Sequence, residues 1–389
     1  MGDSIKRVEL KDGSVRYRFV VDIGPDPNTG KRRQKTFTFD RKRDAQAERA
    51  RILHEVGRGT YVVATSATVN ELLDAYLKHA TRDVEAGTAS NYRDALLPVR
   101  DHLGDRRVQT LGEEDIDGLV DWMLTGARKR GGRPGSGLSA RTASLTLGQL
   151  RAALNLAIRR QMVVRNVALD TRIPRSARKA DAERRAERRP WTADEVRVFL
   201  TATREDRLFA PILLSMLGLR PAEVCGLRWG QVDLNEKRLS VAVTRTMVDG
   251  EAVEKDPKTA SGRRTLPLPE VAANALRDHR KRQAEEQLAA GGAYIGRGYV
   301  LADELGAPFK TDQLRRRFYR LMEAAEVRKV RPYDARHSCL TYLAANGVPD
   351  VVVSAWAGHA DLSLAKRIYV HPDATHLAPA AQALNALLS

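Results

Sequence analysis

The spacing of apolar residues changes along the chain, and this change most constrains how the chain can fold. From Val15 to Ile23 apolar residues take alternate positions, with Arg16 and Arg18 between them, as in a half-buried strand. Later apolar residues recur at helical spacing. One such run comprises Leu147, Leu150, Leu154 and Ile158. The pattern predicts an α+β chain that is mainly helical and has small β-sheets.

Residues 1–60 predict a three-stranded sheet followed by a helix. A strand over residues 31–39 is expected to carry its basic residues on one face, while a helix from about residue 41 to 57 covers the apolar side. The segment holds 15 Lys/Arg against 9 Asp/Glu, so we expect a basic solvent face. Such a face suits a DNA groove, although an ordinary solvated strand has the same composition. The candidate DNA contacts are Arg16, Arg18, Lys31, Arg33 and Lys35.

Residues 66–172 predict an all-helical domain. Thr68 and Glu71 form a capping-box signature, and further helices are expected over 88–103, 113–129 and 139–162. Residues 173–190 follow as a basic linker. We interpret it mainly as solvated chain, although a linker that crosses DNA would look the same.

Residues 191–389 predict a third domain that is mainly helical with one small sheet. Helices are expected over 192–203 and 208–217, a strand-rich region over about 238–268, and helices again after it.

The charge balance favours a polyanionic partner. The chain has 66 Lys and Arg against 49 Asp and Glu, a formal net charge of +17. DNA is the leading candidate, because no long apolar stretch or basic amphipathic anchor supports a membrane. The start of the sequence lacks an apolar signal region, and two cysteines exclude a disulfide framework. We therefore expect a cytoplasmic, nucleoid-associated protein.

Five short motifs stand in a fixed order in the last domain. Each one alone is weak, because an arginine can be a surface ion-pair partner and a tyrosine can be part of a core. The motifs are GLRPAE at 218–223, DPKT at 256–259, YDARH at 333–337, AGH at 357–359 and RIYVH at 367–371.

Together these motifs resemble the catalytic set of the tyrosine recombinases, the family of phage and mobile-element integrases. The resemblance includes a tyrosine, Tyr369, ten residues after the histidine of the AGH motif, His359. It extends to flanking sequence such as SGRRTLPLP at 261–269. It covers the last domain strongly and the helical domain moderately. The N-terminal sheet resembles the arm-type DNA-binding domain of integrases. The catalytic residues that the resemblance implies are Arg220, Lys258, Arg336, His359 and Tyr369, with Tyr333 at a further position of the pattern.

The chemistry of these residue types fits DNA cleavage. Two arginines can bind the charge that builds on a phosphate, because each offers a planar fork of donors that lysine lacks. Tyr369 can attack and later leave, so the step is reversible. Lys258 is the choice for protonating the leaving oxygen, and His359 would hydrogen-bond the phosphate. Glu223, three residues after Arg220, is placed to orient it.

One position departs from the family pattern. Tyr333 stands where the family has the first histidine of HxxR. A phenol can donate to phosphate but is a poor base at neutral pH. A metal site built from His337, Cys339, His359 and His371 is disfavoured because its spacing matches no closed zinc pattern.

The resemblance implies a site-specific integrase that forms a 3′-phosphotyrosyl intermediate and a Holliday junction without a cofactor. It implies a homotetramer on core and arm-type DNA sites, with host DNA-bending and directionality factors as further partners. Two alternatives remain at this point. A type IB topoisomerase shares the chemistry, but the arm-like domain and the C-terminal tail argue against it. A non-catalytic regulator on the same fold is opposed by the intact residue set.

Overall fold

The computed structural model divides the chain into two compact units, Met1–Arg184 and Arg185–Ser389. It describes residues 5–10, 13–25, 32–128, 132–187, 189–256 and 262–358. The boundary between the units lies inside the segment expected as a basic linker.

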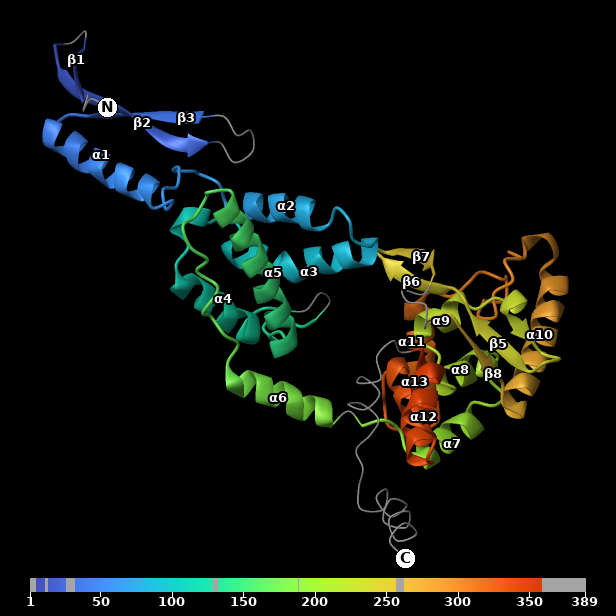
Figure 1. The fold of residues 1–389 in the computed structure, drawn as a ribbon. Helices are drawn as coiled ribbons and strands as arrows, with labels where there is room; N and C mark the ends of the chain where they lie inside the picture. The colour runs from blue at the N-terminus through green and yellow to red at the C-terminus, as the bar shows by residue number, and fades with distance from the viewer. Residues whose placement is uncertain are drawn as a thin grey trace, which may run out of the picture. The chain divides into compact units, whose positions relative to one another are not determined.

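The first unit begins with an antiparallel sheet of three strands in the order β1-β2-β3. The strands are β1 (Lys6–Glu9), β2 (Val15–Pro25) and β3 (Arg32–Phe39), and α1 (Lys42–Gly57) lies along one face of the sheet (Figure 1). The ring of Phe19 stacks on those of Phe37 and Phe39, with centroids 5.3 and 5.9 Å apart. Apolar residues of β2 complete this core with Ala45 and Ile52 of α1. The predicted sheet and helix are confirmed.

Arg33 and Lys35 of β3 share one face as expected, but it is not the face of Arg16 and Arg18, so the expectation of a single basic solvent face is wrong. The register places Lys35 opposite Val21 and Phe37 opposite Phe19, so Lys35 lies on the side that α1 covers. Arg33 shares this side, and its Nη2 donates to Oε1 of Gln161 at 2.7 Å. Arg18 instead lies between Lys6 and Thr38 on the open face. The open face therefore carries Arg16 and Arg18 but neither Arg33 nor Lys35. Lys31 lies outside the described residues.

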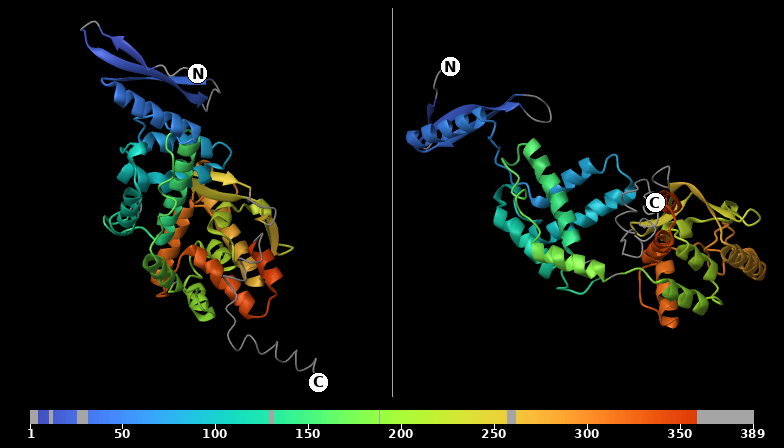
Figure 2. Two further views of the ribbon diagram at one scale, coloured as in Figure 1. Left: turned by 60° about the vertical axis from the view of Figure 1, so that its left-hand side comes forward. Right: turned by 60° about the horizontal axis from the view of Figure 1, so that its bottom comes forward.

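A helical bundle forms the rest of the first unit. It contains α2 (Val69–Ala80), α3 (Ala86–Leu103), the short η1 (Val108–Thr110), α4 (Glu113–Thr125) and α5 (Ala140–Arg159). The predicted capping box is present: the Glu71 amide donates to Thr68 Oγ1 at 3.3 Å, and the Thr68 amide donates to Glu71 Oε2 at 2.8 Å. Figure 2 shows the long helices of the bundle lying against one another, and apolar residues of α2, α3, α4 and α5 form one core.

The linker segment contains a helix that the sequence reasoning did not predict. This helix, α6 (Arg175–Ala186), buries none of its residues. Ala, Arg, Lys and Glu are strong helix formers, and ion pairs such as Arg184 with Asp181 at 2.7 Å add local support. Helix formation here needs no apolar face, which is why a search for apolar periodicity misses it.

The second unit is mainly helical and contains two small sheets. Its helices are α7 (Ala193–Ala202), α8 (Phe209–Met216), α9 (Pro221–Gly226), α10 (Glu270–Ala290), α11 (Thr311–Ala324), α12 (Pro332–Ala345) and α13 (Asp350–Ala357), with short turns η2 (Trp229–Gln231) and η4 (Gly291–Ala293). One sheet has the order β4-β5-β8, from β4 (Val232–Asp233), β5 (Arg238–Val241) and β8 (Arg264–Pro267). The other pairs β6 (Thr244–Val248) with β7 (Glu251–Lys255). The α+β class is confirmed, with two small sheets among the described residues of this unit where one was expected.

The core of the second unit fixes the elements that carry the motifs. Every residue of α8 from Ala210 to Met216 is buried, and this helix leads directly into the GLRPAE motif. Trp191, Phe199 and Phe318 pack as an aromatic cluster nearby, and the Trp191 backbone amide donates to Ser338 Oγ of α12 at 2.8 Å. The start of this unit is thus joined to the helix that carries YDARH.

Candidate active site

Arg220 and Glu223 stand at the start of α9 and bind each other. Pro221 occupies the first helical position, which suits its fixed φ angle, and Arg220 precedes it as the N-cap with an extended backbone. Glu223 Oε2 accepts from the Arg220 amide at 2.8 Å, and its Oε1 accepts from Arg220 Nη1 at 2.6 Å. The Arg220 side chain stays 29% exposed, while that of Glu223 is only 1% exposed. The expected contact between the two is confirmed, and Arg220 keeps access to solvent.

A second arginine, Arg264, binds the same Glu223 carboxylate. The sequence patterns did not identify this residue. Arg264 of β8 donates from Nη1 to Glu223 Oε1 at 3.0 Å and from Nη2 to Oε2 at 2.9 Å. Burial alone would raise the pKa of the Glu223 carboxyl, but the bonds and charges of Arg264 and Arg220 outweigh it and lower that pKa. Glu223 is therefore a buried anion at neutral pH, held by two guanidinium groups.

Arg336 is completely buried on α12. Its Nη1 donates to the Gly218 carbonyl and its Nη2 to the Ala357 carbonyl, and Nη1 lies 4.0 Å from Glu223 Oε2. Burial, followed by the like charge of Arg220, lowers the pKa of Arg336 to about 10. The guanidinium remains protonated at neutral pH, so the site keeps this positive charge.

Backbone carbonyls of two glycine-containing motifs help to hold the arginines. Gly358 ends α13 in the left-handed conformation at φ 64°, and its carbonyl accepts from Arg220 Nη2 at 3.1 Å. Gly218 has φ +94°, and a Cβ there would lie 3.4 Å from Trp356 Nε1. A side chain at Gly218 would strain the backbone that offers its carbonyl to Arg336. Both motifs thus supply acceptors as well as side chains.

The buried cluster has a surplus of positive charge. Arg220, Arg264 and Arg336 contribute three charges and Glu223 removes one, so the four side chains carry 3 − 1 = +2. Such a surplus in a partly water-excluded place attracts an anion and stabilises charge that develops on it. The arrangement suits a phosphate group.

Tyr333 and His337 lie on the helix of Arg336 but differ from it in exposure. Tyr333 is 40% exposed, and its ring meets that of His337 edge-on with centroids 5.1 Å apart. Burial lowers the pKa of His337, which favours the neutral imidazole. The phenol of Tyr333 is therefore accessible to an incoming molecule.

Three of the predicted catalytic residues lie outside the described residues: Lys258, His359 and Tyr369. Their neighbours in the chain are described. Lys258 falls between β7, which ends at Lys255, and β8, which begins at Arg264. His359 directly follows Gly358, the residue whose carbonyl binds Arg220.

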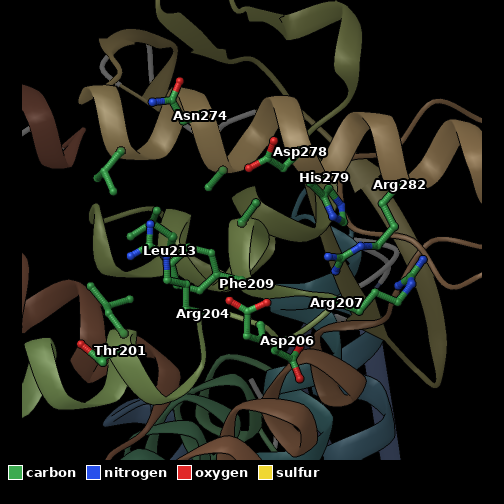
Figure 3. A pocket seen from close by; sticks show the side chains of 15 residues that line it. Thr201, Arg204, Asp206, Arg207, Phe209, Leu213, Asn274, Asp278, His279 and Arg282 are labelled. Carbon is green, nitrogen blue, oxygen red and sulfur yellow. The ribbon is translucent and has the colours of Figure 1, made fainter.

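The hollow drawn in Figure 3 is separate from this cluster. Its volume is about 480 Å³, and its lining comes from α7, α8, α10 and the chain between α7 and α8. Arg204, Asp206 and His279 are among the lining residues, whereas no predicted site residue is. His279 is buried and its Nε2 is 2.7 Å from the Val300 carbonyl, which accounts for it as a packing residue.

The described part of the chain contains neither a metal-binding cluster nor a membrane-spanning helix. No group of three or more His, Cys, Asp or Glu residues there could hold a metal ion. Of the disfavoured metal cluster, His359 and His371 fall outside that part. No described helix is long and apolar enough to cross a membrane.

Known proteins resemble this chain over most of its length. The phage integrase family matches residues 191–376. A XerC-like tyrosine recombinase of Caldanaerobacter subterraneus subsp. tengcongensis is 26% identical over 401 residues, which cover 97% of this chain and 98% of the relative.

Solved structures share the fold. The integrase of transposon Tn1549, in complex with a circular intermediate DNA, has a TM-score of 0.63 at 20% identity and covers 82% of this chain and 100% of its own. A lambda integrase tetramer bound to a Holliday junction has a TM-score of 0.54 at 18% identity, with 94% of each chain covered. Sequence and fold together define the class as the tyrosine recombinases, enzymes that break and rejoin DNA. Within that class, residues 191–376 of the chain form a domain of the phage integrase family.

Proposed function

We propose that this enzyme is a site-specific integrase that cuts and rejoins DNA through a covalent bond to Tyr369. The observation that carries the proposal is the buried cluster with a charge of +2, in which Glu223 and backbone carbonyls fix Arg220 and Arg336. A guanidinium group that is already fixed in position before DNA binds can stabilise the charge that develops on the phosphate without having to reorganise during the reaction.

The reaction runs in two reversible transfers. The Tyr369 phenol gives its proton to water as its oxygen attacks the scissile phosphorus, the bond to the 5′ oxygen breaks, and Lys258 gives that oxygen a proton. The product is a 3′-phosphotyrosyl link and a free 5′ hydroxyl. A 5′ hydroxyl from the partner strand then attacks the link and releases the tyrosine, so the number of phosphodiester bonds is conserved and no cofactor is consumed.

Of the two histidine positions of the family pattern, one holds a histidine in this chain and the other a tyrosine. His359 is the proposed hydrogen-bond donor to the phosphate. Tyr333 takes the other position, and its exposed phenol suits a second donor but not a base. Proton removal from Tyr369 therefore does not depend on Tyr333 in this account.

DNA is the proposed partner of both units. The helical bundle and the second unit would bind the core site, and the open face of the β1-β2-β3 sheet would bind arm-type DNA through Arg16 and Arg18. Because the lambda integrase with a similar fold forms a tetramer on a Holliday junction, we propose the same assembly here. Host DNA-bending and directionality factors complete the proposed partners, and the proposed place of action is the nucleoid in the cytoplasm.

Recombination of the DNA that flanks the gene tests the proposal. Purified protein is incubated with a supercoiled plasmid that carries the recovered flanking segments, and the products are sequenced across the junctions. Integration or excision at one fixed position supports a site-specific integrase. Relaxation of the plasmid without any exchange of partners would instead identify a topoisomerase, and binding without any cutting would identify a regulator.

A further inference from the structure

Arg264 joins three parts of the second unit through one guanidinium group. Its two Nη atoms bind both oxygens of Glu223 on α9 at 3.0 and 2.9 Å. Its Nε donates to the Trp356 carbonyl near the end of α13 at 2.7 Å, and Nη1 is 3.3 Å from the Gly262 carbonyl. The side chain is 7% exposed, so all of these bonds form away from bulk water. Few side chains other than arginine can serve so many acceptors at once.

The hydrogen bonds of Arg264 to Glu223 affect how that carboxylate pairs with Arg220 and Arg336. Glu223 is nearly fully buried and must be compensated by cations. Arg336 already lies at ion-pair distance, 4.0 Å from Glu223 Oε2, but donates its Nη hydrogens to backbone carbonyls. Arg264 binds both carboxylate oxygens and so fixes the carboxylate in the orientation in which it accepts from Arg220 Nη1 at 2.6 Å. Without Arg264, the carboxylate could turn away from Arg220 and draw Arg336 out of its carbonyl contacts.

We propose that Arg264 is a positioning residue for DNA cleavage, which acts by fixing the Glu223 carboxylate so that Glu223 orients Arg220 and does not pull Arg336 from its carbonyl contacts. The inference rests on the proposed function, because it assigns those two arginines to the phosphate. Arg264 itself touches no reacting atom. Its contribution depends on the shape of the guanidinium as well as on its charge.

Two variants separate shape from charge. Arg264→Gln removes both, and lowers the charge of the cluster from +2 to +1. Arg264→Lys keeps the charge but offers a point donor that cannot bind both Glu223 oxygens and the Trp356 carbonyl together. We expect a single-turnover cleavage rate about 100-fold lower for Arg264→Gln, and an intermediate loss for Arg264→Lys, because small misplacements of reacting groups cost rates of this order. The DNA dissociation constant should change by no more than about threefold, since the bulk of DNA affinity comes from other phosphate contacts.

Arg207 offers a matched control for general loss of packing. Like Arg264, it forms a bidentate pair with one glutamate, Glu286, at 2.6 and 2.7 Å. It also donates to the backbone carbonyl of Ala302 at 2.9 Å. Its side chain is 17% exposed. Arg207→Lys should lower the melting temperature as Arg264→Lys does, but leave the cleavage rate near that of the wild type below the melting range.

A double-mutant cycle with Glu223 tests the route of the effect. In a Glu223→Gln background the carboxylate charge is gone, so Arg264→Gln should slow cleavage by no more than about threefold, near the error of additivity. Substrates with sulfur in place of the 5′ leaving oxygen need less protonation. With these substrates the cleavage rate of Arg264→Gln should stay just as far below that of the wild type, because the variant affects the placement of Arg220 and Arg336 and not the proton donor.

The experiment measures covalent protein–DNA product on a nicked suicide substrate for the wild type, these variants and Tyr369→Phe. Normal cleavage by Arg264→Gln would overturn the inference, as would full additivity with Glu223→Gln, rescue by sulfur, or an equal loss in Arg207→Lys. The proposed function predicts a covalent protein–DNA product for the wild type and none for Tyr369→Phe. If the wild type forms no such product, the proposed function is refuted instead. The two failures are thus distinguishable.

Discussion

The arginines of the second unit and those of the N-terminal sheet are held in opposite ways. Arg336 is completely buried and has fixed carbonyl partners. Arg16 pairs with Asp40, a carboxylate whose side chain is 73% exposed, and Arg18 is exposed on the open face. A buried guanidinium acts through fixed geometry, whereas an exposed one acts mainly through charge that salt can screen. The two regions should therefore respond differently to the same kinds of substitution.

The largest effect is expected from changing the shape of an arginine of the cluster, the partly exposed Arg220 or the buried Arg336, while keeping its charge. Arg220→Lys and Arg336→Lys should each lower the cleavage rate about 1,000-fold, because the loss of one fixed donor to a developing oxyanion costs rates of this order. Cleavage of a nicked substrate under single-turnover conditions measures the effect. Arg18→Lys on the open face is the matched control, and it should leave cleavage unchanged. Near-normal rates for both cluster variants would remove the phosphate role from this cluster.

Removing the proposed proton donor should have the next largest effect. Lys258→Ala should slow cleavage about 100-fold, since general acid catalysis contributes at least that much. A substrate with sulfur at the 5′ leaving position should restore most of the rate, because a thiolate leaves without a proton. If sulfur does not rescue the variant, Lys258 is not the acid.

The two faces of the N-terminal sheet provide a sharper test of the exposed region. Arg16→Gln with Arg18→Gln should weaken binding to arm-type DNA, and lower the slope of log affinity against log salt by about 2, roughly one for each lost phosphate contact. Arg33→Gln with Lys35→Gln removes the same charge from the side that α1 covers, and should change the slope less. Titrations at several salt concentrations provide the measurement, and a protein without residues 1–60 sets the baseline. Equal slopes for the two pairs would contradict the assignment of the open face.

The smallest effect is expected from a chelator. The arginine cluster already supplies the positive charge that metal ions supply in other nucleases. Cleavage with and without EDTA should therefore proceed at the same rate. A loss in EDTA that added metal restores would reopen the metal hypothesis for His337, Cys339, His359 and His371.

Local sequence patterns predicted most elements of the fold, since these depend on nearby residues. The Thr68–Glu71 capping box and the helix ending at Leu103 are present as expected. The phase of β3 could also have been predicted, because Arg33 and Lys35 share alternate positions with Phe37 and Phe39, which have to face the core. Helix α6 escaped because its stability comes from propensity and ion pairs instead of an apolar stripe.

The candidate site was only partly predictable, because its supports come from distant parts of the chain. Arg220 and Glu223 are three residues apart, so their contact follows from helix geometry. Arg264 is 41 residues from Glu223, and Arg336 is 118 residues from Gly218, whose carbonyl it binds. No local periodicity links such pairs. The SGRRTLPLP text contains Arg264, yet a sequence match alone does not indicate what that side chain binds.

The covalent bond to Tyr369 is the central claim, and one measurement tests it most directly. Wild-type protein and Tyr369→Phe are incubated with a radiolabelled suicide substrate whose cut strand cannot be rejoined, and the products are separated under denaturing conditions. The change removes one oxygen and keeps the ring. The account predicts a labelled protein–DNA adduct for the wild type, with the attached peptide containing Tyr369, and none for Tyr369→Phe at equal DNA binding. An adduct of normal yield with Tyr369→Phe would contradict the account.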